Sequence, residues 1–275
     1  MKTYENFTEA FYGNLLELKA DGELCDSVGE SSSVGSGFGK KDRPFKEIIK
    51  HTFMIKNPLD RMLRNPIREV DNNFCYANAI WTLAGSNSLD FIRTFNRRGD
   101  LFSDDGIMLN GAHGFRLMNE IGINQIQNNI DRIKKDPTTR RAVSIVWTQR
   151  DSHTNSKDIP CIESIQFLLR QNKLHCIVNM RSQSALMVLP YDLFLFTFLQ
   201  EYVARKLQVE VGNYYHSSGS FHYYMDEESL VDKVLASPEQ NDAATPQTLT
   251  CMPETRDAKG MAFRLYRDVI ETMRR

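Results

Sequence analysis

The sequence predicts a single domain of mixed α/β or α+β class, in which helices pack on a large mixed sheet. The chain has 275 residues, of which 41% are hydrophobic, so it is long enough to bury one sizeable core. Segments with helical periodicity and segments rich in β-branched residues follow one another without a strict alternating order. No internal repeat divides the sequence, and we therefore expect residues 1–275 to form one domain.

The first 70 residues are predicted to contain a helix, a loop and a strand region. Residues 5–19 have apolar side chains at helical spacing and predict an amphipathic helix. Residues 26–41 are rich in glycine and serine and predict a flexible loop. A phosphate-binding P-loop is the alternative, but Val34 and Lys41 stand where that motif requires glycine and serine or threonine. Residues 44–70 are predicted to contain strand and turn, with two Asn-Pro breakers.

Two helices are predicted in the middle of the chain. The first covers residues 73–84 and ends at Gly85, a residue type that often terminates helices. The second carries four isoleucines on one face and stops at Asp136 and Pro137, because the residue before a proline disfavours the helical conformation. These isoleucines are Ile123, Ile126, Ile130 and Ile133.

The rest of the chain is predicted to supply strands, a buried helix and a loop. Residues 142–147 have strand composition, and residues 164–180 are predicted to form a hairpin. Asp192 can cap the helix that follows, which is rich in phenylalanine and apolar nearly all round, so we expect it in the core. Residues 237–257 contain three prolines and many polar residues and predict a long loop. A final helix is expected over about 260–274.

Charge and composition exclude several classes of protein. With 34 basic and 35 acidic residues the net charge is −1, which does not favour a broad nucleic-acid or membrane surface. No apolar run is long enough to span a bilayer, and residues 1–20 lack the features of a signal peptide. The five cysteines are scattered and odd in number, without the spacing of a zinc site. We therefore expect a cytoplasmic protein without a bound metal.

Cys161 is the first candidate for a chemical role. Pro160 before it and the strand-like run after it fix its position in the chain. Arginines brought near by the fold could lower the pKa of its thiol and favour the nucleophilic thiolate. A lone cysteine is more often a small buried hydrophobic residue, so both interpretations stay open from these residues alone.

A set of motifs in order between Asn73 and Tyr224 resembles the thymidylate synthase superfamily, whereas the first 70 and last 50 residues match weakly. The spacing between Arg181 and Asp192 is also similar to that of the family. The motifs are Trp81-x-Leu83-x-Gly85, Gly111 to Leu117, Gln125-Ile126 through Asp136-Pro137 to Arg140-Arg141, Pro160-Cys161, Arg181-Ser182, Leu189 to Asp192 and Gly219-x-x-His222-x-Tyr224.

The resemblance implies covalent chemistry on a pyrimidine nucleotide. In that family a cysteine thiolate adds to C6 of the base, and C5 then takes a one-carbon unit from 5,10-methylenetetrahydrofolate. Hydride from the folate yields a methyl group, and water yields a hydroxymethyl group. Cys161 matches the nucleophile. The resemblance also implies a large twisted mixed sheet and a homodimer that pairs sheet to sheet.

Four residues match the family's ligands for the nucleotide phosphate. Arg181 and Ser182 match the binders within one subunit, and a guanidinium group suits a phosphate dianion. Arg140 and Arg141 match the pair that reaches the phosphate from the other subunit. The resemblance therefore implies two shared sites in an obligate homodimer.

The sugar and the base have their own matched residues. His222 and Tyr224 match the ligands of the sugar hydroxyl, and residues two apart on a strand face the same side. Asp192 matches the residue that reads the base, which is asparagine in enzymes acting on dUMP and aspartate in the cytidylate hydroxymethylases. An amide can donate to O4 of uracil, whereas a carboxylate cannot donate unless it is protonated but can accept from N4 of cytosine. Asp192 therefore indicates a cytosine nucleotide, unless it only caps the following helix.

Four positions depart from the family pattern. Asn78 replaces the glutamate that orders water and relays protons, and an amide cannot act as an acid or base at neutral pH. His113 replaces the tyrosine of the water network, where it could titrate or be neutral packing. Ser184 replaces the aspartate that anchors the folate pterin, and Val188 replaces a glycine that lets folate approach.

Three functions remain compatible with these residues. The first is hydroxymethylation of dCMP or CMP with methylenetetrahydrofolate, which Asp192 favours. The second is Cys161-dependent chemistry on a pyrimidine nucleotide without folate, which the changed folate positions favour. The third is a nucleotide-binding relative without turnover. Ordinary thymidylate synthesis is disfavoured by Asp192 together with Asn78, and the choice between ribose and deoxyribose stays open.

Overall fold

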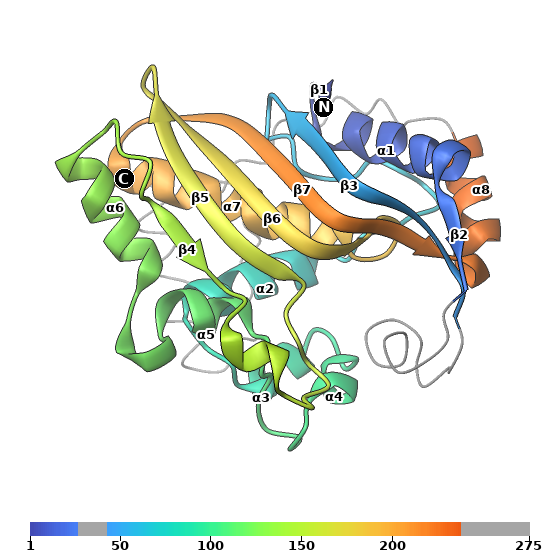
Figure 1. Ribbon diagram of the computed structural model, residues 1–275, viewed down its shortest axis with the longest axis horizontal. Helices are drawn as coiled ribbons and strands as arrows, with labels where there is room; N and C mark the ends of the chain where they lie inside the picture. The colour runs from blue at the N-terminus through green and yellow to red at the C-terminus, as the bar shows by residue number, and fades with distance from the viewer. Residues whose placement is uncertain (27–42, 238–275) are drawn as a thin grey trace.

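The computed structural model describes residues 1–26 and 43–237, which are built around one seven-stranded sheet (Figure 1). The strand order is β1-β3-β7-β6-β5-β4, and β2 pairs with β3 off this path. The pairs β1–β3 and β6–β7 are parallel and the others are antiparallel, so the predicted mixed sheet is confirmed. The strands are β1 (Lys2–Tyr4), β2 (Glu23–Cys25), β3 (Phe45–Ile55), β4 (Val143–Ile145), β5 (Ile162–Arg170), β6 (Lys173–Ser184) and β7 (Glu210–Tyr224).

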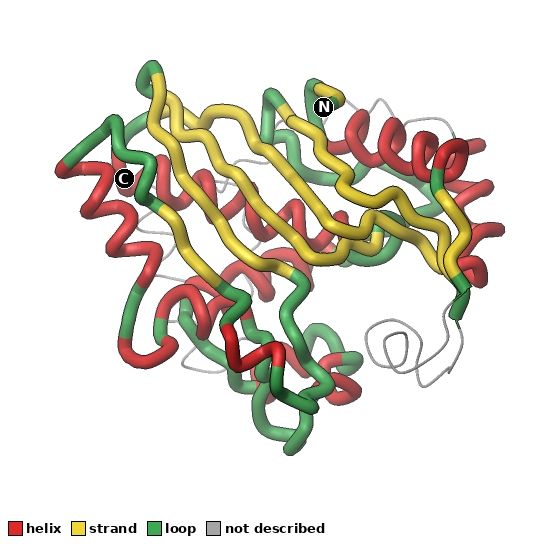
Figure 2. The backbone as a smooth tube through the Cα atoms, in the orientation of Figure 1, coloured by secondary structure: helices red, strands yellow, loops and turns green. Residues whose placement is uncertain are grey.

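The described residues also form eight α-helices and short 3₁₀ helices at 120–122, 149–152 and 225–227. In Figure 2 the strands lie in front, and helices lie behind the sheet and at its ends. Figure 1 places α7 and α2 behind strands β5, β6 and β7. The helices are α1 (Phe7–Asp21), α2 (Asn72–Leu83), α3 (Leu89–Arg93), α4 (Gly99–Phe102), α5 (His113–Met118), α6 (Gln125–Lys135), α7 (Leu189–Leu207) and α8 (Glu228–Ala236).

Helix α7 forms the centre of the core, as its apolar sequence predicts. Its phenylalanines are buried against the inner face of the sheet and against α2. The helix begins at Leu189 because Pro190, which lacks an N–H group, fits the first helical turn. The prediction that Asp192 caps this helix is wrong: Val188 is the N-cap, Asp192 lies within the first turn, and its carboxylate accepts a hydrogen bond from Gln183 instead.

The predicted hairpin is confirmed and is longer than expected. Gln171 and Asn172 have φ angles of 50° and 60°, the left-handed conformation that a two-residue hairpin turn requires. Strand β6 continues to Ser184, and it therefore carries Arg181 and Ser182 past the end of the predicted hairpin. This extension places several of the matched site residues on one rigid element.

The other predicted elements agree with the structure except at their ends. Helices α1, α2 and α6 form within two residues of the predicted boundaries. Ile123 was expected on the buried face of α6, but it precedes the helix and is 43% exposed. Only residues 143–145 of the predicted strand at 142–147 pair as β4. Apart from Asp26 and Ser237, the predicted loops at 26–41 and 237–257 and the predicted helix at 260–274 lie outside the described residues.

No helix in the described parts of the chain has the length and apolarity needed to cross a membrane. Those parts also hold no group of three or more His, Cys, Asp or Glu side chains arranged to bind a metal ion. The expectation of a cytoplasmic protein stays a prediction.

Candidate active site

Cys161 immediately precedes β5, where the chain enters the sheet. Its carbonyl accepts a hydrogen bond of 2.8 Å from the Arg181 backbone N–H, which ties it to β6. Burial raises the pKa of the Cys161 thiol, and although Arg181 opposes this shift, the carboxylates of Asp192 and Asp158 add to it. The expectation that nearby arginines lower this pKa is therefore wrong in its net effect. The thiol is the resting form at neutral pH.

Arg181 lies across the segment that leads into Cys161. Its Nε donates to the carbonyl of Pro160 at 3.0 Å, and its Nη2 donates to the carbonyl of Ile159 at 3.2 Å. The guanidinium also lies over the Trp147 ring at 5.6 Å from its centroid. Although the residue is exposed, these contacts hold its charge beside the nucleophile. The structure thus brings together the predicted phosphate ligand and the predicted catalytic thiol.

The matched sugar ligands lie on the neighbouring strand. Ser182 of β6 is level with Ser220 of β7, and Ser184 is level with His222. The rings of His222 and Tyr224 are 5.2 Å apart, as expected for residues on the same side of a strand. Burial, with smaller contributions from Arg181 and Arg43, lowers the pKa of His222 to about 4, although a hydrogen bond with the Ser220 backbone opposes the shift. His222 is therefore neutral at physiological pH and suited to hydrogen bonding with a hydroxyl group.

Arg43 supports Tyr224 and was not found by sequence reasoning. Its guanidinium lies 3.8 Å from the centroid of the Tyr224 ring, and its Nε donates to Asp226 at 3.0 Å. A second ion pair joins Arg43 to Glu227 at 3.4 Å. The only signal in the sequence was an arginine immediately before a predicted strand, in the region that matches the family weakly.

Asp192 is a buried carboxyl group with one direct side-chain partner. It is 8% exposed, and its Oδ2 accepts a hydrogen bond of 3.0 Å from Nε2 of Gln183. Burial raises the pKa of Asp192 to about 7, although the bond from Gln183 opposes the shift. Both protonation states are therefore populated near neutral pH. Gln183 was also missed, since a polar residue in a strand usually faces solvent.

Helices α2 and α5, called the opposite wall below, carry two of the substituted positions. Asn78 lies half-buried in α2, and His113 begins α5. These helices pack closely, because a Cβ atom at Gly114 would lie 2.4 Å from the backbone of Thr82. The His113 ring stacks on Phe196 at 6.1 Å, and burial lowers its pKa to about 4, with a further contribution from Arg116. These values favour the neutral-packing interpretation of His113.

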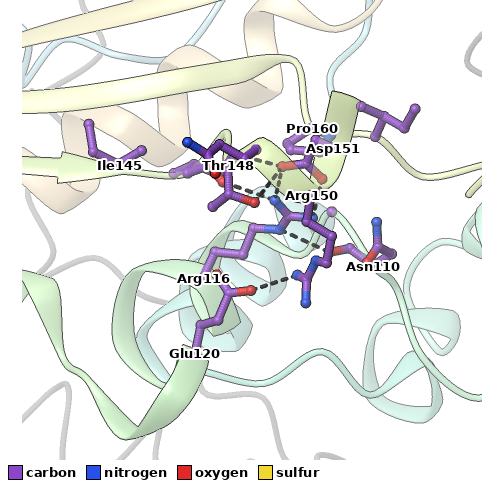
Figure 3. A network of polar contacts seen from close by, with 12 residues as sticks. Asn110, Arg116, Glu120, Ile145, Thr148, Arg150, Asp151 and Pro160 are labelled. Carbon is purple, nitrogen blue, oxygen red and sulfur yellow. Dashed lines mark hydrogen bonds and ion pairs between the residues drawn. The ribbon is translucent and has the colours of Figure 1, made fainter. Parts of the chain in front are cut away.

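A buried ion pair braces this wall against the segment before Cys161 (Figure 3). Arg116 donates to both carboxylate oxygens of Asp151, at 2.6 and 2.8 Å, and both side chains are fully buried. Arg116 also donates to the carbonyls of Asn110 and Val146, both at 2.9 Å. Loss of either charged partner would leave an unpaired buried charge. The pair therefore fixes α5 relative to the chain that leads to β5.

Asp158 continues this brace toward the nucleophile. Its Oδ2 accepts a hydrogen bond of 2.6 Å from the backbone N–H of Gly111, and its carbonyl accepts one of 3.1 Å from Asn110. Since Arg181 binds the next two carbonyls, residues 158–160 are held from both sides. This arrangement limits the positions open to Cys161.

Ser184 and Val188 flank the turn between β6 and α7. Ser184 is 8% exposed, and its hydroxyl has no hydrogen-bond partner among the described residues. Val188 is 39% exposed and immediately precedes α7. Arg68 holds the turn through hydrogen bonds to the carbonyls of Leu186 at 3.0 Å and Met187 at 2.9 Å. The turn is thus rigid, with one unsatisfied polar group.

Arg140 and Arg141 are exposed and distant from Cys161 within one subunit. The carbonyl of Arg140 accepts a hydrogen bond of 2.9 Å from Gln166. Gln166 lies five residues along β5 from Cys161, a separation of about 17 Å in an extended strand. Their predicted role at the phosphate of a second subunit stays a prediction.

Comparison with known proteins agrees with the motif resemblance. The thymidylate synthase family model matches residues 66–264. The deoxyuridylate hydroxymethyltransferase of Bacillus phage SP01 is 32% identical over 218 residues, which cover 74% of this chain and 56% of that protein. The deoxyuridylate hydroxymethyltransferase of Pseudomonas phage M6 is 31% identical over 206 residues, covering 74% and 57% respectively. This chain therefore spans little more than half the length of these relatives.

The fold has a solved counterpart. Thermostable thymidylate synthase A from Bacillus subtilis superposes with a TM-score of 0.71 at 18% identity, over 85% of each chain. This likeness confirms the predicted fold, a mixed sheet packed with helices in a single domain. Because the family model covers most of the sequence, the chain belongs to the thymidylate synthase family.

Proposed function

We propose that this protein transfers a one-carbon unit to C5 of a pyrimidine nucleotide, and that it hydroxymethylates a cytosine nucleotide, dCMP or CMP. The observation that carries this proposal is Asp192, a buried carboxyl at the base-reading position. The hydroxymethyl product is supported by relatives named deoxyuridylate hydroxymethyltransferases. Enzymatic transfer of this kind is the activity of the family's named members.

Binding of the nucleotide is assigned to the β5–β7 side of the site. Arg181 and Ser182 would hold the phosphate, with Arg140 and Arg141 supplied by a second copy of the chain. Helices α2 and α7 lie on one side of the sheet in Figure 1, which supports pairing of two copies through the other side. His222 and Tyr224 would hold the sugar hydroxyl. This arrangement would bring the base near Cys161.

Cys161 is the proposed nucleophile. Its thiol must lose a proton before it adds to C6, because its pKa lies above the ordinary value. Protonated Asp192 would donate to N3 of cytosine and accept from the amino group on C4. The same neutral acid can accept from N3–H and donate to O4 of uracil, so protonation of Asp192 alone does not select the base.

The residues on the folate side fit 5,10-methylenetetrahydrofolate in one respect. The buried Ser184 hydroxyl lacks a partner among the described residues and could bind a polar atom of the pterin. Val188 would form an apolar part of the same wall. When bound, this cofactor supplies the one-carbon unit.

A uracil nucleotide is the second candidate substrate, because three relatives are named for action on deoxyuridylate. Release of tritium from 5-³H-labelled dCMP, CMP, dUMP and UMP, with and without methylenetetrahydrofolate, distinguishes the candidates. We expect release from a cytosine nucleotide only with folate, and a product heavier by one CH₂O unit. Release from uracil nucleotides alone would reject the assigned base. Release without folate would support the folate-independent function, and binding without release would indicate a relative without turnover.

A further inference from the structure

We propose that Gln183 is a specificity-determining residue, which holds the Asp192 carboxyl in place and uses its own side-chain oxygen to select a base with an amino group at C4. This inference rests on the proposed function and assigns a role to a residue outside the matched family motifs. It concerns how one buried carboxyl that can be neutral or charged distinguishes cytosine from uracil.

The geometry joins Gln183 directly to the base-reading residue. Gln183 is on β6, two residues beyond Arg181, and is 1% exposed. Its Nε2 is 3.0 Å from Oδ2 of Asp192, on the first turns of α7. Because both residues are on rigid elements, the bond fixes which carboxylate oxygen faces Gln183. The other oxygen, Oδ1, can then carry the proton that is donated to N3, while Oδ2 keeps a second lone pair for the amino group.

The side-chain oxygen of Gln183 is the second observation. Oε1 is buried and has no hydrogen-bond partner among the described residues. Since Nε2 is bound to Asp192, the amide cannot turn over without losing that bond. A buried carbonyl oxygen without a donor costs about 1–3 kcal/mol, so a donor from a ligand would remove this cost. The amino group of cytosine carries two N–H donors, whereas O4 of uracil would place oxygen against oxygen.

Asp192 would also move a proton in the first covalent step. The Cys161 thiolate forms the Sγ–C6 bond, the C5–C6 π pair moves to C4–C5, and the C4–N3 π pair takes the proton from Oδ1. The step ends with a neutral adduct and an Asp192 carboxylate, so the charge is conserved. The Gln183 hydrogen bond stabilises that carboxylate. Among the described residues, the Asp192 charge also raises the pKa values of Cys161 and Tyr214.

The test replaces Gln183 by methionine, which keeps the side-chain length and removes both polar atoms. Binding of dCMP, CMP, dUMP and UMP is measured by calorimetry for wild type and Gln183→Met. We expect the ratio of cytosine to uracil affinity to fall by at least about tenfold. Loss of the hydrogen bond raises the pKa of Asp192. The pH at which dCMP affinity starts to fall, as Asp192 loses its proton, should therefore move upward.

Gln200→Met is the matched control. Gln200 is also fully buried, its Nε2 donates to the carbonyl of Leu174 at 2.9 Å, and its Oε1 also lacks a partner among the described residues. It lies eight residues after Asp192 on α7, about 12 Å along the helix. We expect lower stability in this variant but an unchanged base ratio and an unchanged pH dependence of dCMP binding.

The outcomes separate this inference from the proposed function. An unchanged base ratio in Gln183→Met, with binding intact, would reject the role of Gln183 alone. A fall of equal size in Gln200→Met would attribute the effect to general loosening of the core and would also reject it. Wild-type preference for uracil would overturn the selection argument. A wild-type protein that binds none of the four nucleotides would reject the proposed function itself.

Discussion

The two walls of the active site differ in the charge that they offer to a substrate. The wall formed by β5, β6 and β7 carries the residues matched to the family's thiol, arginine and sugar ligands, and α7 adds the Asp192 carboxyl. The opposite wall, on α2 and α5, has Asn78 and a neutral His113. Neither of these positions carries a charge at neutral pH. The difference indicates that proton transfer depends on the wall that binds the base.

The largest expected effect concerns the nucleophile. Cys161→Ser should reduce tritium release from C5 by at least about 10⁴-fold, because a hydroxyl group is a much weaker nucleophile than a thiolate at this site. Nucleotide affinity should change by no more than a few-fold, since the phosphate and sugar ligands are untouched. The measurements are tritium release and calorimetric binding of dCMP.

Cys25→Ser is the control for this variant, because Cys25 is half-buried on β2 and lies outside the site. Its activity should equal that of wild type. Retained tritium release in Cys161→Ser would show that the nucleophile lies elsewhere, and the contrast between the two walls would then lose its chemical basis.

A smaller effect is expected when the positive charge at position 181 is kept but the shape of the side chain is altered. Arg181→Lys should weaken nucleotide binding by about 10- to 100-fold, because an ammonium group cannot reproduce the fork that meets a phosphate and two backbone carbonyls. Binding of the corresponding nucleoside, which lacks the phosphate, should change much less. Calorimetric titration with the nucleotide and with the nucleoside measures the two affinities.

Arg150→Lys is the matched control for Arg181→Lys. Arg150 is also exposed, and it pairs with Glu120 at 2.6 Å rather than with the segment before Cys161. Equal losses for nucleotide and nucleoside in Arg181→Lys would mean that the arginine only supports residues 159 and 160. The phosphate would then be bound by other groups.

Much of the fold was predictable because its elements bury periodic apolar faces. Helix α6 has buried Ile126, Ile130 and Ile133 at helical spacing. The β5–β6 hairpin turns at Gln171 and Asn172, which both have positive φ angles that few residue types adopt easily. Ile123 was assigned wrongly because periodicity does not mark the residue where a helix begins. More than one residue near the start of α6 could cap the helix, so the local sequence does not fix its first residue.

The chemical positions were predictable from motifs, but their electrostatics were not. The motif places Cys161 and Asp192 in the chain, yet the pKa of each group depends on burial by segments distant in sequence. Gln183 is the clearest omission. The sequence of β6 does not show which face of the sheet the Gln183 side chain is on. Only the packing of α7 against β6 shows that this side chain reaches Asp192.

The neutrality of His113 provides a test of the opposite wall. Its folded-state pKa of about 4 lies below the ordinary value of 6.5, so the stability gained from the neutral ring is present above pH 6.5 and is lost as the pH falls toward 4. Between pH 7 and pH 5, the free energy of unfolding of His113→Phe should therefore fall by about 1–2 kcal/mol less than that of wild type. Urea unfolding at the two pH values measures this difference.

His153→Phe supplies the comparison for His113→Phe, because His153 is exposed and its replacement also exchanges an imidazole ring for a phenyl ring. In the tritium assay, His113→Phe should also keep the wild-type pH profile above pH 5.5. A lost or shifted limb in that profile would assign a titrating role to His113 and would restore a proton relay to the opposite wall.

The smallest expected effect tests whether the unpaired Ser184 hydroxyl is kept for a ligand. Ser184→Ala should leave stability unchanged or raise it by up to about 1 kcal/mol, because it removes a buried polar group without a partner among the described residues. Ser218→Ala is matched, since Ser218 on β7 is also buried and its hydroxyl has no partner in the part of the chain that the structure describes. If Ser184 binds the cofactor, only Ser184→Ala should weaken the folate dependence of tritium release. Equal behaviour of the two variants would reject Ser184 as a ligand for the cofactor, and neither wall would then have an assigned polar ligand for folate.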